Sequence, residues 1–182
     1  MRDSQRKRVY TAERAAFPDC SETSDPTLPT VEDIERYVKK VWGSKRVQAA
    51  FPRSTLHYSR VPEVADGRGC RRAIAYGTYQ ITIPKWARRE WVVLHELAHI
   101  IVERERLHPK NEVAAHGWHF CEVYLKLVLY MLGREAHDAL KASFKKHKVK
   151  FTKPRERKPI SDEQRAALVA RLAAARELKK AA

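Results

Sequence analysis

The sequence has few of the residues that build a cross-linked framework. Its three cysteines, Cys20, Cys70 and Cys121, are widely spaced and odd in number, and none belongs to a CxxC pair. This pattern argues against a disulfide framework and against a structural zinc ribbon. We therefore expect three free thiols in a reducing compartment.

Long apolar runs are also missing. No apolar segment approaches the ~20 residues that a membrane-spanning helix needs. The opening residues, MRDSQRKRVY, are charged and have no apolar segment behind them, which is the opposite of a secretory signal. The expectation is a cytoplasmic protein with no membrane partner.

Acidic residues are the minority charge. The chain has 37 Lys and Arg against 22 Asp and Glu, a formal net charge of +15. The segment from Lys141 to Lys158 holds nine of the basic residues and one Glu. Such a cluster can bind a phosphate backbone and release its counterions, or it can be a solvated connector. The candidate nucleic-acid-binding residues are Lys145, Lys146, Lys148, Lys150, Lys153, Arg155, Arg157 and Lys158.

A length of 182 residues suits one domain with an appendage. Helical spacing of apolar residues predicts N-terminal helices within 1–50, one ending before Pro18 and one capped by Thr30. The stretches STLHYSRV and RRAIAYGTYQITIP, within 53–84, predict a small antiparallel sheet of two or three strands. Two apolar helices are expected within 87–133. The fold class is therefore α+β.

The C-terminal part is expected to differ from the domain of residues 1–146. A further helix is predicted at 134–147, and a basic linker at 147–160 contains two prolines. An amphipathic helix then fills 161–182, where Ser161 and Gln164 form a capping box. This last helix is expected to dock on the domain, with a partner contact as the alternative.

The stretch VVLHELAHIIV contains an HExxH motif, His95-Glu96-xx-His99. On a helix, residues four apart share a face, so both imidazoles can bind one ion. Glu96 is turned by about 100°, where it can reach a metal-bound water without ligating the metal. The helix is otherwise strongly apolar, and three polar side chains there are costly unless a ligand or a hydrogen-bond network satisfies them. The motif predicts a metal site.

A catalytic zinc usually takes three protein ligands and a water. His116 is the preferred third ligand, because it opens the next apolar helix. Its competitors are His119, Glu112 and Glu122, which could replace or support it. His108, beside a proline, is expected to be exposed. One Zn²⁺ per chain is predicted, although nickel, cobalt or iron would accept the same imidazoles.

The pairing of HELAH with a downstream HGWHF resembles the SprT-like, or Spartan-type, zinc metallopeptidases of the zincin class. The N-terminal RDSQRKRVYTAE also resembles a small metallohydrolase family of actinobacteria and their phages. The first resemblance covers roughly residues 55–133. It implies that His95, His99 and His116 hold the metal, that Glu96 is the catalytic base, and that Phe120 packs the second helix. The second resemblance implies a bacterial cell or a phage-infected host.

The leading hypothesis is a zinc-dependent peptidase that acts near nucleic acid, with Glu96 as general base. The alternative is a DNA-binding protein whose zinc site is structural or vestigial. A hydrolase of non-peptide amides, or a phage peptidase that cuts a host regulator, is a third possibility. The specificity pocket is expected at the sheet edge around 75–83, with Tyr76, Tyr79 and Tyr130 as candidates for stabilising the tetrahedral intermediate.

Overall fold

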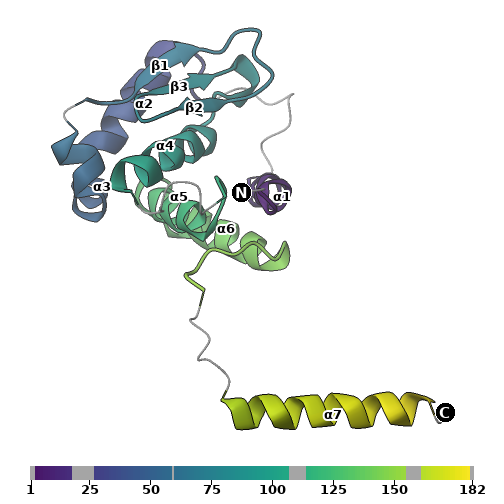
Figure 1. Cartoon of the computed structure of the whole chain (residues 1–182). Helices are drawn as coiled ribbons and strands as arrows, with labels where there is room; N and C mark the ends of the chain where they lie inside the picture. The colour runs from purple at the N-terminus through teal and green to yellow at the C-terminus, as the bar shows by residue number, and fades with distance from the viewer. Residues whose placement is uncertain (1–2, 18–26, 59, 107–113, 155–160, 181–182) are drawn as a thin grey trace.

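The computed structural model describes residues 3–17, 27–58, 60–106, 114–154 and 161–180. It is an α+β fold, as predicted, with a three-stranded sheet beside a group of helices (Figure 1). None of the helices in these residues has the length and hydropathy needed to cross a membrane. The helices are α1 Arg6–Ala16, α2 Val31–Gly43, α3 Lys45–Ala50, α4 Glu90–Glu105, α5 Trp118–Met131, α6 Arg134–Lys146 and α7 Asp162–Lys180. The strands are β1 Glu63–Asp66, β2 Ile74–Tyr76 and β3 Gln80–Ile83. Two short helical turns are η1 Arg53–His57 and η2 Lys85–Ala87.

Helix α4, which carries the HExxH motif, runs through the core. Its apolar residues lie on every side, so most of the helix is buried. It lies between the sheet and α5 (Figure 1). The helix ends at Arg106, whose φ of 51° is left-handed and breaks the helical repeat. The two metal-ligand candidates on α4 are therefore fixed by packing on both sides.

The sheet is mixed, so the predicted antiparallel sheet is wrong in one of its two pairings. Strand β2 pairs antiparallel with β3 through a tight hairpin, in which Gly77 has a φ of +54°. Strand β1 pairs parallel with the other edge of β3. The turn after β1 starts at Gly67, where a Cβ would lie 2.5 Å from the backbone nitrogen of Pro84. Only glycine allows the chain to leave β1 so close to the end of β3.

The predicted strand at STLHYSRV is also wrong, because its first residues form the helical turn η1. Helix α4 imposes this conformation. The Glu105 carboxylate accepts a hydrogen bond from the backbone N–H of Ser54 at 2.7 Å, and Arg104 donates one to the Ser54 carbonyl at 3.0 Å. These long-range contacts outweigh the local β-preference of Thr and Tyr.

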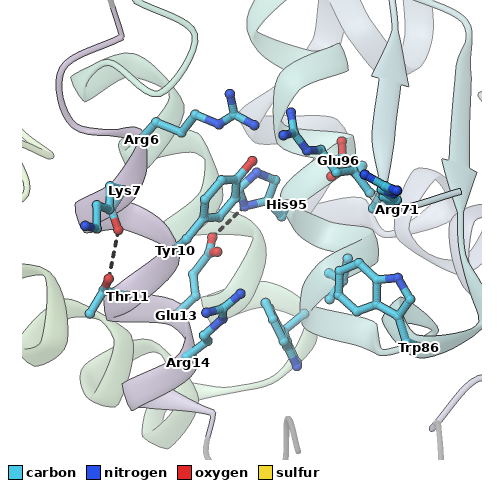
Figure 2. Close-up of a pocket in the computed structure, with 14 residues that line it drawn as sticks. Arg6, Lys7, Tyr10, Thr11, Glu13, Arg14, Arg71, Trp86, His95 and Glu96 are labelled. Atoms are coloured by element: carbon cyan, nitrogen blue, oxygen red, sulfur yellow. Dashed lines mark hydrogen bonds and ion pairs between the residues drawn. The ribbon is translucent and has the colours of Figure 1, made fainter. Parts of the chain in front are cut away.

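The N-terminal helix is confirmed, and it belongs to the domain core. Val9 and Ala12 of α1 are fully buried, and the hydroxyl of Ser143 on α6 donates a hydrogen bond to the Ala12 carbonyl at 2.7 Å. Helix α1 packs on α6 through this face, and the adjoining face, which carries Tyr10 and Glu13, turns toward α4 (Figures 1 and 2).

The predicted second helix is confirmed as α2, with the capping box between Thr30 and Asp33. The capping box of α7 is also present, between Ser161 and Gln164. The predicted docking of α7 is wrong: its side chains are exposed from Ser161 to Arg176 (Figure 1). Its apolar stripe of Leu168 and Leu172 is narrow, so docking would bury little surface.

Candidate metal centre

Three histidines converge where α4 meets the start of α5. His95 and His99 lie one turn apart on α4, and His116 stands just before Gly117, the N-cap of α5. One ligand nitrogen from each lies within 4.8 Å of the others. His95 and His116 are buried and His99 is partly buried. These three side chains lie close enough together to bind a metal ion, in the combination that the sequence predicted.

Two carboxylates from the N-terminal segment orient the buried histidines. Glu13 on α1 lies 2.5 Å from Nδ1 of His95, and Asp3 lies 2.6 Å from Nδ1 of His116. In this geometry the Nδ1–H of each histidine donates to a carboxylate. The Nε2 atom then keeps a free lone pair, through which it can bind a metal ion. The two Nε2 atoms lie 3.2 Å apart. Two facing lone pairs repel each other unless a cation or a proton lies between them, so the arrangement fits a metal ion.

The histidine pKa values favour ligation by His99 and His116. Burial, together with the neighbouring His95 and His116, holds the pKa of His99 well below its ordinary value. Burial and the nearby His95 lower the pKa of His116 to about 4, against the opposing effect of Asp3. Burial also disfavours the charged form of His95, but Glu13 outweighs this and raises the His95 pKa. At neutral pH, His99 and His116 are therefore neutral imidazoles, the form that binds metal.

Glu96 is buried beside this group and is not one of the converging ligands. Burial, and then the charge of Glu13, raises the pKa of its carboxyl group, while His95 and a hydrogen bond from the backbone N–H of Ala75 oppose the rise. Strand β2, which contains Ala75, therefore holds the Glu96 side chain from the sheet side. A carboxylate with a raised pKa, held next to a metal group, is able to accept and release a proton.

Phe120, which the resemblance implied to be an aromatic residue that packs the second helix, packs against all three histidine rings. Its ring centroid lies 4.7 Å from that of His95, 4.3 Å from that of His99 and 4.9 Å from that of His116. Gln5 supports the same region, since its Nε2 donates to the His116 carbonyl at 2.5 Å. The group is thus held by packing from α5 and by hydrogen bonds from the N-terminal segment.

The alternative third ligands lie elsewhere or outside the described residues. The His119 ring stacks on Trp118 at a centroid distance of 3.6 Å and is not part of the converging group. Glu122 forms an ion pair with Lys126 at 2.9 Å. Glu112 and His108 fall in residues 107–113, which the structure does not describe. Among the candidates that are described, His116 alone joins His95 and His99.

A cavity of about 500 Å³ opens beside the three converging histidines, between α1 and α4 (Figure 2). We call it the α1–α4 cavity. His95 and Glu96 are among its buried walls. The predicted tyrosines at 76, 79 and 130 do not line it; Tyr10 does, stacked on His95 with ring centroids 5.5 Å apart. Its full lining is Arg6, Lys7, Tyr10, Thr11, Glu13, Arg14, Arg71, Arg72, Ala73, Trp86, Trp91, Val92, His95 and Glu96.

Asp3, Glu13 and Tyr10 are the site residues that sequence reasoning missed. The sequence signal for them is weak: on α1, Arg6, Tyr10 and Glu13 fall at helical spacing, on the face that adjoins the apolar Val9 and Ala12. The residues of the predicted nucleic-acid segment lie at the end of α6 and beyond. Those that the structure describes are all exposed, namely Lys145, Lys146, Lys148, Lys150 and Lys153. Arg155, Arg157 and Lys158 lie outside the described residues.

Comparison with known proteins adds no relative: no family model, no curated protein and no solved structure matches this chain. Fold and site therefore define its class by themselves. It is an α+β protein whose central helix and the segment before the next helix bring three histidines together, within reach of one metal ion.

Proposed function

We propose that the protein is a zinc-dependent metallopeptidase of the SprT-like, zincin class. The observation that carries this proposal is the position of Glu96 relative to the three histidines. Glu96 follows the ligand His95 in the chain, is not one of the converging ligands, and lines an open cavity. A purely structural metal site has no use for such a carboxylate, whereas hydrolysis requires one.

When bound, Zn²⁺ would be held by His95, His99 and His116, and it would supply an activated water and polarise the substrate carbonyl. Glu96 would hold the proton taken from that water and return it to the leaving amine. The hydrogen bond from Ala75 fixes its carboxylate, and burial keeps its pKa above that of an exposed glutamate. Both features suit a group that must carry a proton for part of each cycle.

Tyr10 supports the same reaction. Its ring covers His95, and Arg6 hydrogen-bonds to its hydroxyl group. Its position in the cavity wall makes it a candidate donor to the developing oxyanion, in place of the three tyrosines proposed from sequence.

The first test is the metal content of the purified full-length chain by plasma mass spectrometry. We expect about one zinc per chain, as for a three-histidine site with an open position. His116→Ala should lose most of that zinc, and His119→Ala should retain it. Equal zinc in both variants would reject His116 as the third ligand.

The second test separates catalysis from metal binding. Glu96→Gln should keep its zinc and lose peptide hydrolysis by about 10²–10⁴-fold, the usual effect of removing a general base. Glu103→Gln is the matched control, because Glu103 is an exposed glutamate of the same helix. Full activity in Glu96→Gln would reject the mechanism.

A further inference from the structure

The walls of the α1–α4 cavity carry an uneven distribution of charge. Its exposed charged members are all basic, and they come from two separate elements, α1 and the connection between β1 and β2 (Figure 2). We call this set the cationic wall; it consists of Arg6, Lys7, Arg14, Arg71 and Arg72.

Most of the cationic wall has no counter-charge in the protein. Among the residues that the structure describes, no carboxylate lies within ion-pair distance of Lys7, Arg14, Arg71 or Arg72. The same part of the fold does form ion pairs where acids are present: Asp66 holds Arg68 at 3.1 Å and Arg88 at 2.8 Å. Uncompensated cations on facing walls of one cavity produce a positive potential that attracts anionic groups.

The two carboxylates of the cavity are buried. The Glu13 carboxylate is hydrogen-bonded to His95, and Glu96 lies next to the three converging histidines. The cavity is therefore acidic at its buried end and basic at its exposed walls. A ligand that matches it is uncharged where it meets Glu96 and anionic on either side of that point.

A polypeptide with acidic side chains has this distribution, because its backbone amide is neutral and its carboxylates stand away from it. A nucleic-acid strand fits less well, since its phosphate charge would sit at the reacting group and face Glu96 and Glu13. The apolar walls agree with a peptide: Trp86 is 51% exposed and Trp91 is partly exposed beside it, as surfaces for side chains. A volume of about 500 Å³ is the size of an ordinary small-ligand site, enough for a few residues of chain.

We propose that the cationic wall selects polypeptide segments that carry Asp or Glu on both sides of the bond presented to Glu96. This inference rests on the proposed peptidase function and names its substrate class: acidic, extended segments of protein.

Binding is measured first, so that the result does not depend on turnover. The full-length Glu96→Gln protein, loaded with zinc, is titrated into fluorescein-labelled short capped peptides and followed by anisotropy. One peptide has Glu on both sides of a central Ala-Leu pair; the others carry Gln or Lys at the same positions. A single-stranded oligonucleotide of equal charge is the fourth probe. We expect the Glu peptide to bind about tenfold more tightly than the Gln peptide, with the difference shrinking as salt rises.

A pair of double variants locates the binding. Arg71→Ala with Arg72→Ala removes two exposed charges of the cationic wall and should weaken binding of the Glu peptide by about tenfold. Lys145→Ala with Lys146→Ala removes two exposed charges that do not line the cavity, and should change it by less than about twofold. Equal weakening in the two variants would mean general charge attraction and would overturn the proposal.

Two further results would also overturn it. One is equal binding of the Glu and Gln peptides. The other is tighter binding of the oligonucleotide than of the Glu peptide, abolished when Arg71 and Arg72 are replaced, which would assign the wall to nucleic acid.

Hydrolysis by the wild-type protein separates the acidic preference from the proposed peptidase function. Hydrolysis of the Gln and Glu peptides at the same rate would keep the peptidase and reject the acidic preference. Selective, wall-dependent binding of the Glu peptide, with no cleavage of any peptide by the zinc-loaded wild type, would keep the acidic site and reject the peptidase.

Discussion

Oε1 of Glu13 lies 2.5 Å from Nδ1 of His95, a contact that joins α1 to α4 across 82 residues of sequence. A carboxylate in this position fixes the tautomer and the orientation of a ligating imidazole and makes it a stronger donor. Asp3 does the same for His116 at 2.6 Å. The N-terminal segment is thus part of the candidate metal centre, although it contributes none of the three converging histidines.

Removing the charge of Glu13 should weaken metal binding. Glu13→Gln retains a hydrogen-bond acceptor for the Nδ1–H of His95 and removes only the negative charge. We expect its affinity for zinc to fall about 10–100-fold, the usual effect of changing the partner of a ligating histidine. Competition with a chromogenic chelator measures this. Glu35→Gln, an exposed carboxylate on α2, should match the wild type. An unchanged affinity in Glu13→Gln would mean that the contact does not tune the metal.

Zinc affinity should depend on pH through His95. Its pKa lies above the ordinary 6.5, whereas the pKa of His116 is about 4 and that of His99 is well below 6.5. Zinc must displace a proton from a protonated His95, so affinity should fall about tenfold per pH unit below the His95 pKa. In Glu13→Gln the carboxylate that raises this pKa is gone, and the fall should begin at lower pH. Chelator competition between about pH 5 and pH 8 checks both curves. A wild-type curve that is flat down to about pH 5 would contradict this assignment.

The part of the site that sequence could predict is the part encoded locally. His95, Glu96 and His99 lie within five residues of one helix, so the helical repeat alone determines their relative positions. His116 was found because a second apolar helix follows it. Asp3 is 113 residues from His116 in the chain, and no periodicity connects them. Contacts of that kind come from tertiary packing, which a single sequence does not reveal.

In the fold, too, the features encoded locally could be predicted, and those set by tertiary contacts could not. Helices with clear caps, such as α2, were predicted to within a few residues, because the capping box is a local signal. The strand pattern at 54–61 was misleading, since its first residues are held in a helical turn by Arg104 and Glu105 of α4. The parallel pairing of β1 with β3 also could not be predicted from the strand pattern, because the relative direction of two strands depends on the path of the chain between them.

Arg104 should be among the most important residues for stability. Its side chain is fully buried, and it donates hydrogen bonds to the carbonyls of Thr78, Ser54 and Arg60 at 2.7 to 3.0 Å. Its guanidinium also lies 5.1 Å from the ring centre of Tyr58. Arg104→Met leaves these carbonyls without a donor, and we expect the free energy of unfolding to fall by about 3–5 kcal/mol.

Urea unfolding followed by circular dichroism measures this effect. Arg46→Met, at an exposed position of α3, is the control and should change stability by less than about 0.5 kcal/mol. Arg104→Lys should recover little, since one ammonium group cannot reproduce the planar fork of donors. If Arg104→Met were as stable as Arg46→Met, the buried cation would not hold η1 and the hairpin against α4.

The basic segment at the end of α6 and beyond provides the last prediction, which concerns the binding of nucleic acid predicted from the sequence. Its described lysines are exposed, so they are available to phosphate. Substituting Lys145, Lys146 and Lys153 by Gln should lower the slope of log affinity against log salt by up to about 0.9 for each duplex phosphate that these lysines neutralise. Anisotropy of a labelled duplex across several salt concentrations measures that slope.

The alternative is that these lysines serve the helix itself. Lys145 and Lys146 lie in the last turn of α6, where positive charge interacts favourably with the helix dipole, worth about 0.3–1 kcal/mol each. In that case the triple variant would be less stable and would keep its salt slope. A control variant that removes the same charge elsewhere sharpens the comparison, and suitable exposed lysines are Lys39, Lys40 and Lys45. A lower slope in the segment variant, with an unchanged slope in the control, would assign DNA binding to the segment. If both variants kept the slope of the wild type, the lysines would have a structural role only.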